Sequence, residues 1–191
     1  MVYYLKILIL GDSHIPLRAK ELPKKFLRIL TTQKFEFIIF TGDFTSIDVL
    51  NTLKEHSKVY AISGNMDNID LPKKLVINAY GFKIGVIHGH KIRPKGSIRQ
   101  LAKYAAEKDL DILISGHTHF AFAEQSEGIL LLNPGSITGV WAGKTKKTPP
   151  SFGILHLRER IAQFELVTVT ENKLVRKVNN FSLSKAAKFS K

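Results

Sequence analysis

The sequence predicts an α/β fold in which two mixed β-sheets face each other and carry helices on their outer faces. In the first part of the chain, short apolar runs of strand length alternate with amphipathic helical patterns. In the second part, strand-like runs separated by turn residues dominate. The 191 residues, 44 % of them hydrophobic, suit one sizeable core rather than two.

The opening part of the chain has a β-α-β-α-β pattern. The apolar runs that predict its strands are residues 4–10, 37–40 and 59–62. Between them, apolar residues recur at helical spacing over residues 22–30, with Pro23 in the first turn, and over residues 47–53. Thr45 or Ser46 is suited to cap the second helix. This order predicts parallel strands joined by right-handed crossovers.

The rest of the chain predicts a hairpin, one helix and a series of strands. The hairpin turns at Tyr80–Gly81, and the helix covers residues 98–105 with Ser97 as its cap. Further strand-like runs cover residues 112–115, 120–123, 129–132, 152–157, 161–170 and 174–181. We therefore expect a single domain over residues 1–181. Residues 182–191 are expected to form a flexible basic tail, because basic residues without acids mark the end of the chain.

Charge and composition limit the class of partner. The formal net charge is +13, which bears on partners rather than on fold. The basic residues are spread along the chain without a nucleic-acid-binding motif, so nucleic-acid binding is the weaker hypothesis. The absence of cysteine excludes disulfides and thiolate metal sites. The apolar run Val2–Leu10 is too short to span a bilayer, so we expect a soluble cytoplasmic protein that meets membranes only through a protein complex.

Metal-ligating side chains follow the predicted strands. They are Asp12 and His14 after the first strand, Asp43 after the second, Asn65 after the third, His88 and His90 after the hairpin, and His117 and His119 after residues 112–115. Ligands in α/β sheets bind beyond the carboxyl ends of the strands, so these residues are expected to meet at one edge. Five of the seven histidines of the chain fall in these turns, which favours a metal site over coincidence.

The donor types fit two divalent cations. Asp43 has a carboxylate that is able to bridge two ions, Asn65 offers an amide oxygen, and the histidines offer imidazole nitrogens. Nitrogen and oxygen ligands without sulfur suit manganese, iron, zinc or cobalt, and the sequence does not choose among them. With neutral imidazoles the surplus positive charge attracts a phosphate and stabilises a metal-bound hydroxide near neutral pH.

The ordered motifs GDSH, GD, GN, HGH and GHTH resemble those of the calcineurin-like metallophosphoesterase superfamily, in its small single-domain phosphodiesterase branch. The resemblance implies a four-layer α-β-β-α sandwich and a binuclear site. It assigns Asp12, His14 and His119 to one metal, Asn65, His88 and His117 to the other, and Asp43 to the bridge. The implied activity is hydrolysis of a phosphodiester by a metal-bridging hydroxide.

The segments GDSHIP, LPKKF, FKIGVIHGH, DILISGHTH, NPGSITG and PSF further resemble the family of vacuolar protein sorting-associated protein 29, the phosphoesterase-fold subunit of the retromer coat. That family implies a scaffold with a partly degenerate metal site, from which Asp43 and Asn65 depart toward enzymes. It also implies a patch that binds a coat-like protein partner. The counterparts here are Leu30, Ile154, Phe164 and Leu166, unless these residues face the core.

The leaving group lacks an obvious proton donor. Many enzymes of the superfamily carry a histidine after the asparagine of the third strand, but Met66 stands there and cannot donate a proton. His90, or less readily Asp67, is the predicted general acid. Two functions therefore stay open: a metal-dependent phosphodiesterase, and a retromer-like scaffold with low or no catalytic activity.

Overall fold

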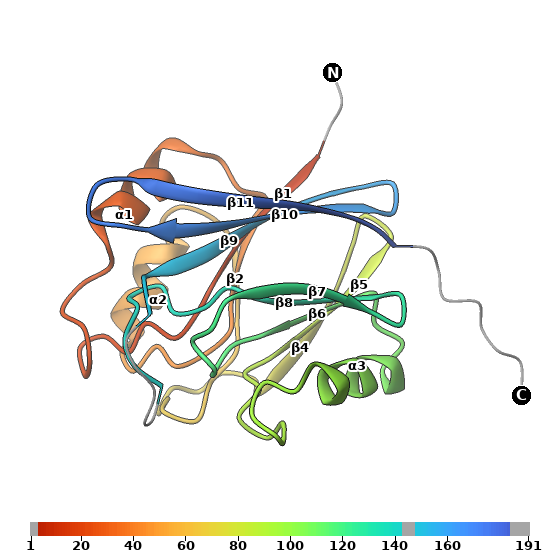
Figure 1. Cartoon of the computed structure of the whole chain (residues 1–191). Helices are drawn as coiled ribbons and strands as arrows, with labels where there is room; N and C mark the ends of the chain where they lie inside the picture. The colour runs from red at the N-terminus through yellow and green to blue at the C-terminus, as the bar shows by residue number, and fades with distance from the viewer. Residues whose placement is uncertain (1–3, 143–147, 184–191) are drawn as a thin grey trace, which may run out of the picture.

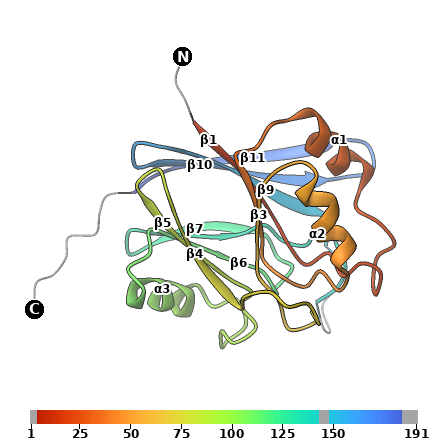
Figure 2. The same ribbon diagram turned by 180° about the vertical axis from the view of Figure 1, so that it is seen from behind.

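The computed structural model describes residues 4–142 and 148–183, and within them the chain forms two mixed sheets and three helices (Figure 1). The helices are α1 (Lys24–Thr32), α2 (Ile47–Lys54) and α3 (Ile98–Glu107). Helices α1 and α2 cover the outer face of one sheet, and α3 covers the outer face of the other, as both ribbon views show (Figures 1 and 2). The predicted four-layer α/β sandwich is confirmed.

The first sheet has the strand order β11-β10-β9-β1-β2-β3. Its strands are β1 (Leu5–Leu10), β2 (Phe37–Phe40), β3 (Val59–Ala61), β9 (Ser151–Arg158), β10 (Ile161–Val169) and β11 (Leu174–Ser182). Strands β1, β2 and β3 are parallel, whereas β9, β10 and β11 extend the sheet in antiparallel fashion. The parallel part follows from the crossovers through α1 and α2, as the alternating pattern predicts.

The second sheet has the strand order β4-β5-β6-β8-β7. Its strands are β4 (Lys74–Ala79), β5 (Phe82–Ile87), β6 (Ile112–Ser115), β7 (Phe122–Ser126) and β8 (Ile129–Asn133). The hairpin between β4 and β5 turns at Tyr80–Gly81, where both residues have positive φ. Strands β5, β6 and β8 are parallel, so the carboxyl ends of β5 and β6 lie at the same edge of this sheet.

The helix starts follow local capping chemistry. Ser46 accepts a hydrogen bond from the Asp48 N–H at α2, and Ser97 accepts one from the Gln100 N–H at α3. Helix α1 begins at Lys24, later than the apolar pattern from Leu22 predicts, because Pro23 is its N-cap in an extended conformation. None of the helices in the described part of the chain is long and apolar enough to cross a membrane.

Three apolar clusters separate the four layers. The central cluster lies between the sheets, and the other two lie between each sheet and its helices. Strand β1 shows the division: Ile7 and Ile9 face the central cluster, whereas Leu8 and Leu10 face α1 and α2. Both faces of the strand are therefore buried, which is why it is almost continuously apolar.

The predicted partner patch is wrong for three of its four residues. Leu30 is 2 % exposed, and Ile154 and Phe164 are fully buried. Phe164 packs against Gly153 of the neighbouring strand, so closely that an added Cβ there would collide with its ring. Leu166 is partly exposed and packs against the central cluster. Leu30 and Ile154 are buried between the first sheet and helices α1 and α2, whereas Phe164 is buried between the two sheets. These three side chains are therefore not available as a docking surface.

Most of the predicted tail lies outside the described residues. The last described strand, β11, ends at Ser182, close to the predicted end of the domain at residue 181. Residues 184–191 of the predicted tail are not among those that the structure describes.

Candidate metal centre

Six of the predicted ligands form two groups at the carboxyl ends of four strands, β1, β2, β5 and β6. One group is Asp12, His14 and His119, and the other is Asp43, His88 and His117. Within each group the ligand atoms lie within 4.8 Å of one another. Both groups open into a cavity of about 310 Å³ that Asn65 also lines. The topology thus brings together residues that are more than a hundred positions apart, because the parallel strands of both sheets end on the same side.

Asp43 lies between the two groups. Its Oδ2 atom is 3.3 Å from Nε2 of His88 and 3.5 Å from Nε2 of His14. Its Oδ1 atom accepts a hydrogen bond of 2.9 Å from the Met66 N–H, which fixes the carboxylate. This is the position that a bridging carboxylate requires, as the sequence predicts.

The hydrogen bonds of two histidines direct their other ring nitrogen toward the cavity. His88 Nδ1 lies 2.8 Å from the Thr41 carbonyl, and His119 Nδ1 lies 2.7 Å from the Val140 carbonyl. A carbonyl accepts only, so each Nδ1 carries the proton and the Nε2 of a neutral ring holds a lone pair. A backbone carbonyl on the far nitrogen is the usual arrangement for a histidine that binds a metal.

Lone pairs therefore converge where a cation would lie. His119 Nε2 is 3.2 Å from His14 Nε2 and 3.3 Å from Oδ1 of Asp12. On the other side, Oδ1 of Asn65 is 3.1 Å from Nε2 of His88. Neutral imidazoles, carboxylates and an amide oxygen repel one another at such distances unless a cation or a proton lies among them. The donor set therefore fits two divalent cations.

Backbone strain concentrates at the same residues. The φ angles are positive at Asp12, His14, Asp43, His117 and His119, none of which is glycine. Positive φ is uncommon outside glycine and is enriched at functional sites. Of the glycines in these turns, Gly42 and Gly89 also have positive φ.

Gly64 and Gly116 are required for another reason, which is that a side chain would not fit at either position. A Cβ at Gly64 would lie 2.6 Å from the Asp43 nitrogen, and a Cβ at Gly116 would lie 2.8 Å from Oδ2 of Asp12. Both distances are shorter than atoms tolerate. These glycines let the backbone of one loop lie directly against a carboxylate of another.

Asp67, one of the two predicted general acids, instead accepts hydrogen bonds from the backbone of the loops after β2 and β3. Its Oδ2 accepts hydrogen bonds of 2.8 Å from the N–H groups of Asp43 and Gly64, and its Oδ1 accepts one of 2.8 Å from Thr45. Three backbone donors leave this carboxylate as an acceptor that joins the loops after β2 and β3. A general acid must donate, so we withdraw Asp67 from that role.

His90, the other predicted acid, lies in the wall beside the second group. Its ring centroid is 5.6 Å from that of His88 and 6.3 Å from that of His117. Burial and the nearby His88 lower the pKa of His90 below its ordinary value. The Nδ1 atom is buried without a partner among the described residues. Its role in proton transfer stays a prediction.

Two cationic residues of the cavity escaped the sequence analysis. Arg18 and Lys95 line it together with the ligands. Each lies in a loop, four residues or more from the nearest motif residue, and no periodicity marks either of them. The position of Arg18 so soon after GDSH is the only signal in the sequence, and it is weak.

The metal-free protein is expected to be most stable near pH 6.5. Burial disfavours protonation of His88, but the carboxylates of Asp43 and Asp12 outweigh it and raise its pKa to about 9 from 6.5. Between these values only the folded chain holds the proton, so the free energy of unfolding falls as pH rises. Burial lowers the pKa of His14 and of His117 to about 4, so only the unfolded chain binds those protons between pH 6.5 and 4. Stability therefore also falls as pH drops.

Urea unfolding in the presence of a chelator, at about pH 5, 6.5 and 9, measures this profile. The loss between pH 6.5 and 9 is expected to be on the order of 2–3 kcal/mol. Replacement of the exposed His56 by alanine leaves the profile unchanged. A free energy of unfolding that is flat from pH 6.5 to 9 would contradict the assigned charge of His88.

Comparison with known proteins agrees with this geometry. Residues 5–160 match the calcineurin-like phosphoesterase superfamily domain. The chain is 42 % identical over 130 residues to MJ0623, a probable metallophosphoesterase of Methanocaldococcus jannaschii, which covers 68 % of this chain and 67 % of that protein. Solved structures of Vps29 share the fold as well.

The Vps29 structure from Cryptosporidium parvum has a TM-score of 0.89 and 32 % identity, covering 95 % of this chain and 100 % of that one. The wild-type Vps29 of Entamoeba histolytica, which was solved with zinc, has a TM-score of 0.86 and 30 % identity, covering 92 % of this chain and 98 % of that one. With its sandwich fold and its His/Asp clusters, this chain belongs to the calcineurin-like phosphoesterase superfamily.

Proposed function

We propose that the protein is a binuclear metal-dependent phosphodiesterase. The observation that carries the proposal is the pair of buried His/Asp groups that share Asp43 and open into one cavity. Family membership supports a metallophosphoesterase, and the donor set supports two divalent ions such as manganese, zinc or iron.

The residues of the cavity would have different roles in such a reaction. Two bound cations would supply Lewis-acid charge for the phosphoryl oxygens and lower the pKa of water. His14, Asp43 and the other ligands hold those cations in fixed positions. Arg18 and Lys95 add positive charge at the cavity, which favours an anionic substrate.

Leaving groups that need no proton are expected to react fastest. Met66 lines the cavity and is 40 % exposed, but it has no proton to donate. His90 lies behind the second group rather than in the lining of this cavity. A phosphodiester with a good leaving group, such as p-nitrophenolate, therefore suits the site better than a dialkyl diester.

The test is hydrolysis of bis-p-nitrophenyl phosphate by protein that has been stripped of metal and reloaded with manganese. We expect turnover that requires the metal and falls more than about 100-fold in Asp43→Asn and in His88→Ala, since loss of even an outer partner of a metal ligand costs 10–100-fold. Asp70→Asn and His56→Ala are matched controls, because both residues are exposed and neither lines the cavity.

The outcome that sinks the proposal is tight binding of two metal ions without turnover of any phosphodiester. That result would favour the second candidate function, a retromer-like scaffold, which the likeness to Vps29 structures supports. A coat-like partner would then have to bind elsewhere than at Leu30, Ile154 and Phe164, since these side chains are buried.

A further inference from the structure

Two cationic side chains line the cavity of the metal centre. The N–H of Arg18 donates a hydrogen bond of 2.8 Å to the carbonyl of His14. Lys95 interacts electrostatically with Asp12 of the first group and with His117 of the second. Cations do not ligate metals, so neither residue is explained by the metal centre. Their position in the cavity wall indicates that they bind an anion together with the metals.

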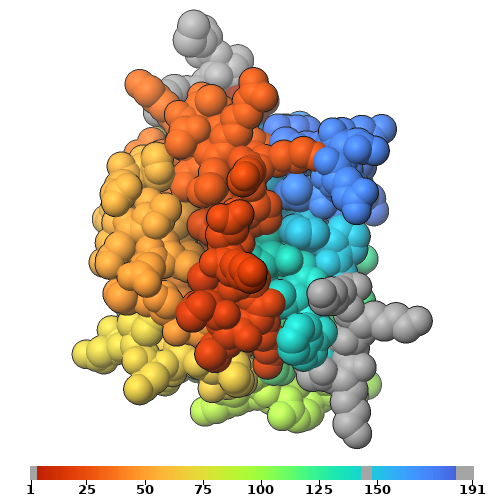
Figure 3. Space-filling model, turned by 90° about the vertical axis from the view of Figure 1, so that its left-hand side faces the viewer, coloured from red at the N-terminus to blue at the C-terminus, as the bar shows by residue number. Residues whose placement is uncertain are grey.

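Arg18 also contacts the only tryptophan of the chain. Its Nη1 donates a hydrogen bond of 2.9 Å to the Trp141 carbonyl, and its Cζ lies 5.3 Å from the centroid of the indole ring. The next residue, Ala142, lines the cavity, and the indole lies against Arg18, which lines the cavity too. Figure 3 shows the red segment after β1 beside the teal segment near residue 140.

The indole is placed to meet a ligand rather than to fill the core. Trp141 is 39 % exposed, although burying so large a side chain would be favourable. Arg18, held by the carbonyl of the same residue, fixes a cation beside the ring. An exposed aromatic ring beside a cation is the arrangement on which a nucleobase stacks while its phosphate is neutralised.

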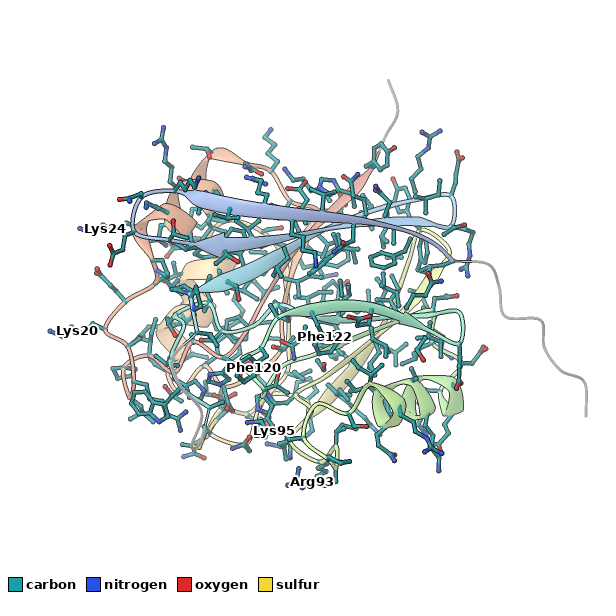
Figure 4. The ribbon with its side chains drawn as sticks, in the orientation of Figure 1. Lys20, Lys24, Arg93, Lys95, Phe120 and Phe122 are labelled. Carbon is teal, nitrogen blue, oxygen red and sulfur yellow. The ribbon has the colours of Figure 1, made fainter. Side chains whose placement is uncertain are left out.

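A second exposed aromatic residue lies on the turn that the loop of Lys95 contacts. Lys95 lies in the loop between β5 and α3, and a Cβ added to the next residue, Gly96, would lie 3.0 Å from Cγ2 of Thr118. This loop therefore contacts the turn that carries Phe120, which is 52 % exposed. Figure 4 labels Lys95 and Phe120 on the same side of the molecule.

We propose that the cavity takes a nucleotide-like phosphodiester, with its phosphate between Arg18 and Lys95 and one base against Trp141. The inference deepens the proposed function and rests on it, because it takes the cavity as the phosphodiester site. The proposal excludes a phosphodiester with only aliphatic groups, because such a substrate has no ring that could stack on the exposed indole.

The experiment compares binding of AMP and ribose 5-phosphate to the full-length, manganese-loaded protein by calorimetry. The two probes carry the same phosphate and sugar and differ in the base. We expect AMP to bind roughly 5- to 150-fold more tightly, the range that one stacked base gives. AMP is also expected to quench the fluorescence of Trp141, which reports this site alone because the chain has one tryptophan.

Variants separate the two parts of the proposed site. Trp141→Leu is expected to abolish the preference for AMP and to leave binding of ribose 5-phosphate unchanged. Arg18→Gln is expected to weaken both probes by about tenfold, since it removes a charged hydrogen-bond donor. Tyr4→Leu is the matched control, because Tyr4 is an exposed aromatic residue that contacts His156 edge-to-face and does not line the cavity.

Equal affinity for the two probes, or a preference for AMP that survives in Trp141→Leu, overturns the inference. Failure of the proposed function would give a different set of results from failure of this inference. Turnover of bis-p-nitrophenyl phosphate without a preference for AMP removes only the nucleotide-like substrate. A preference for AMP that depends on Trp141, without any turnover, keeps the binding site and removes only the phosphodiesterase.

Discussion

Gly64→Ala is expected to abolish metal-dependent turnover, although Gly64 contributes no ligand atom. The added Cβ would lie 2.6 Å from the backbone nitrogen of Asp43 and 2.8 Å from its Cγ, and it would collide with Oδ1. Relief requires the bridging carboxylate or the loop after β3 to move. We expect a loss of activity of about 100-fold, the upper end of the range for loss of groups that orient metal ligands. Manganese calorimetry should show fewer than two tight sites.

Gly128→Ala is the matched control for this substitution. Gly128 lies in the turn between β7 and β8 with a φ of +77°, and no atom of the described residues lies within 4 Å of an added Cβ. The control is expected to cost about 1–2 kcal/mol of stability through its positive φ and to keep full activity. Two tight manganese sites and normal turnover in Gly64→Ala would show that the close approach to Asp43 is not needed.

Phe164→Ala is expected to destabilise the fold by about 3–5 kcal/mol, the cost of emptying a buried aromatic position. The ring is fully buried in the cluster between the sheets and packs against Gly153 of β9. Urea unfolding of the purified protein measures the change. The result also distinguishes a core residue from a docking residue at this position, because truncation of an exposed docking residue would cost less than about 0.5 kcal/mol of stability.

Val178→Ala provides the comparison on the surface. Val178 lies on the edge strand β11 and is 49 % exposed, so its truncation is expected to change stability by less than about 0.5 kcal/mol. If Phe164→Ala were as mild as Val178→Ala, the assignment of Phe164 to the core would be wrong.

The ligand set could be predicted from the sequence because parallel strands impose a simple rule. Each strand of the first half is a short apolar run, and the residue types that follow it are unusual enough to be recognised. Their approach in space then follows from topology alone. His14 and His119 are 105 positions apart, yet their Nε2 atoms lie 3.2 Å apart. The structure places all seven predicted ligands around one cavity or in its two groups.

The sequence did not predict on which face of its strand a buried residue lies. In β9 almost every residue is buried, so alternation does not mark an exposed face. Ile154 therefore looks the same in the sequence whether it faces a partner or the core. Packing of helices on one side and of the second sheet on the other decides the matter.

The sequence by itself determined the succession of strands and helices along the chain, the two-sheet class and the donors of the metal centre, because apolar periodicity and ligand chemistry are local properties. Only the tertiary structure decided that Asp67 joins two loops, that Arg18 and Lys95 line the cavity, and that Trp141 packs against Arg18. Those roles depend on contacts between loops that are distant in sequence. Such contacts leave no periodic mark in the chain, since they are set by how the two sheets pack together.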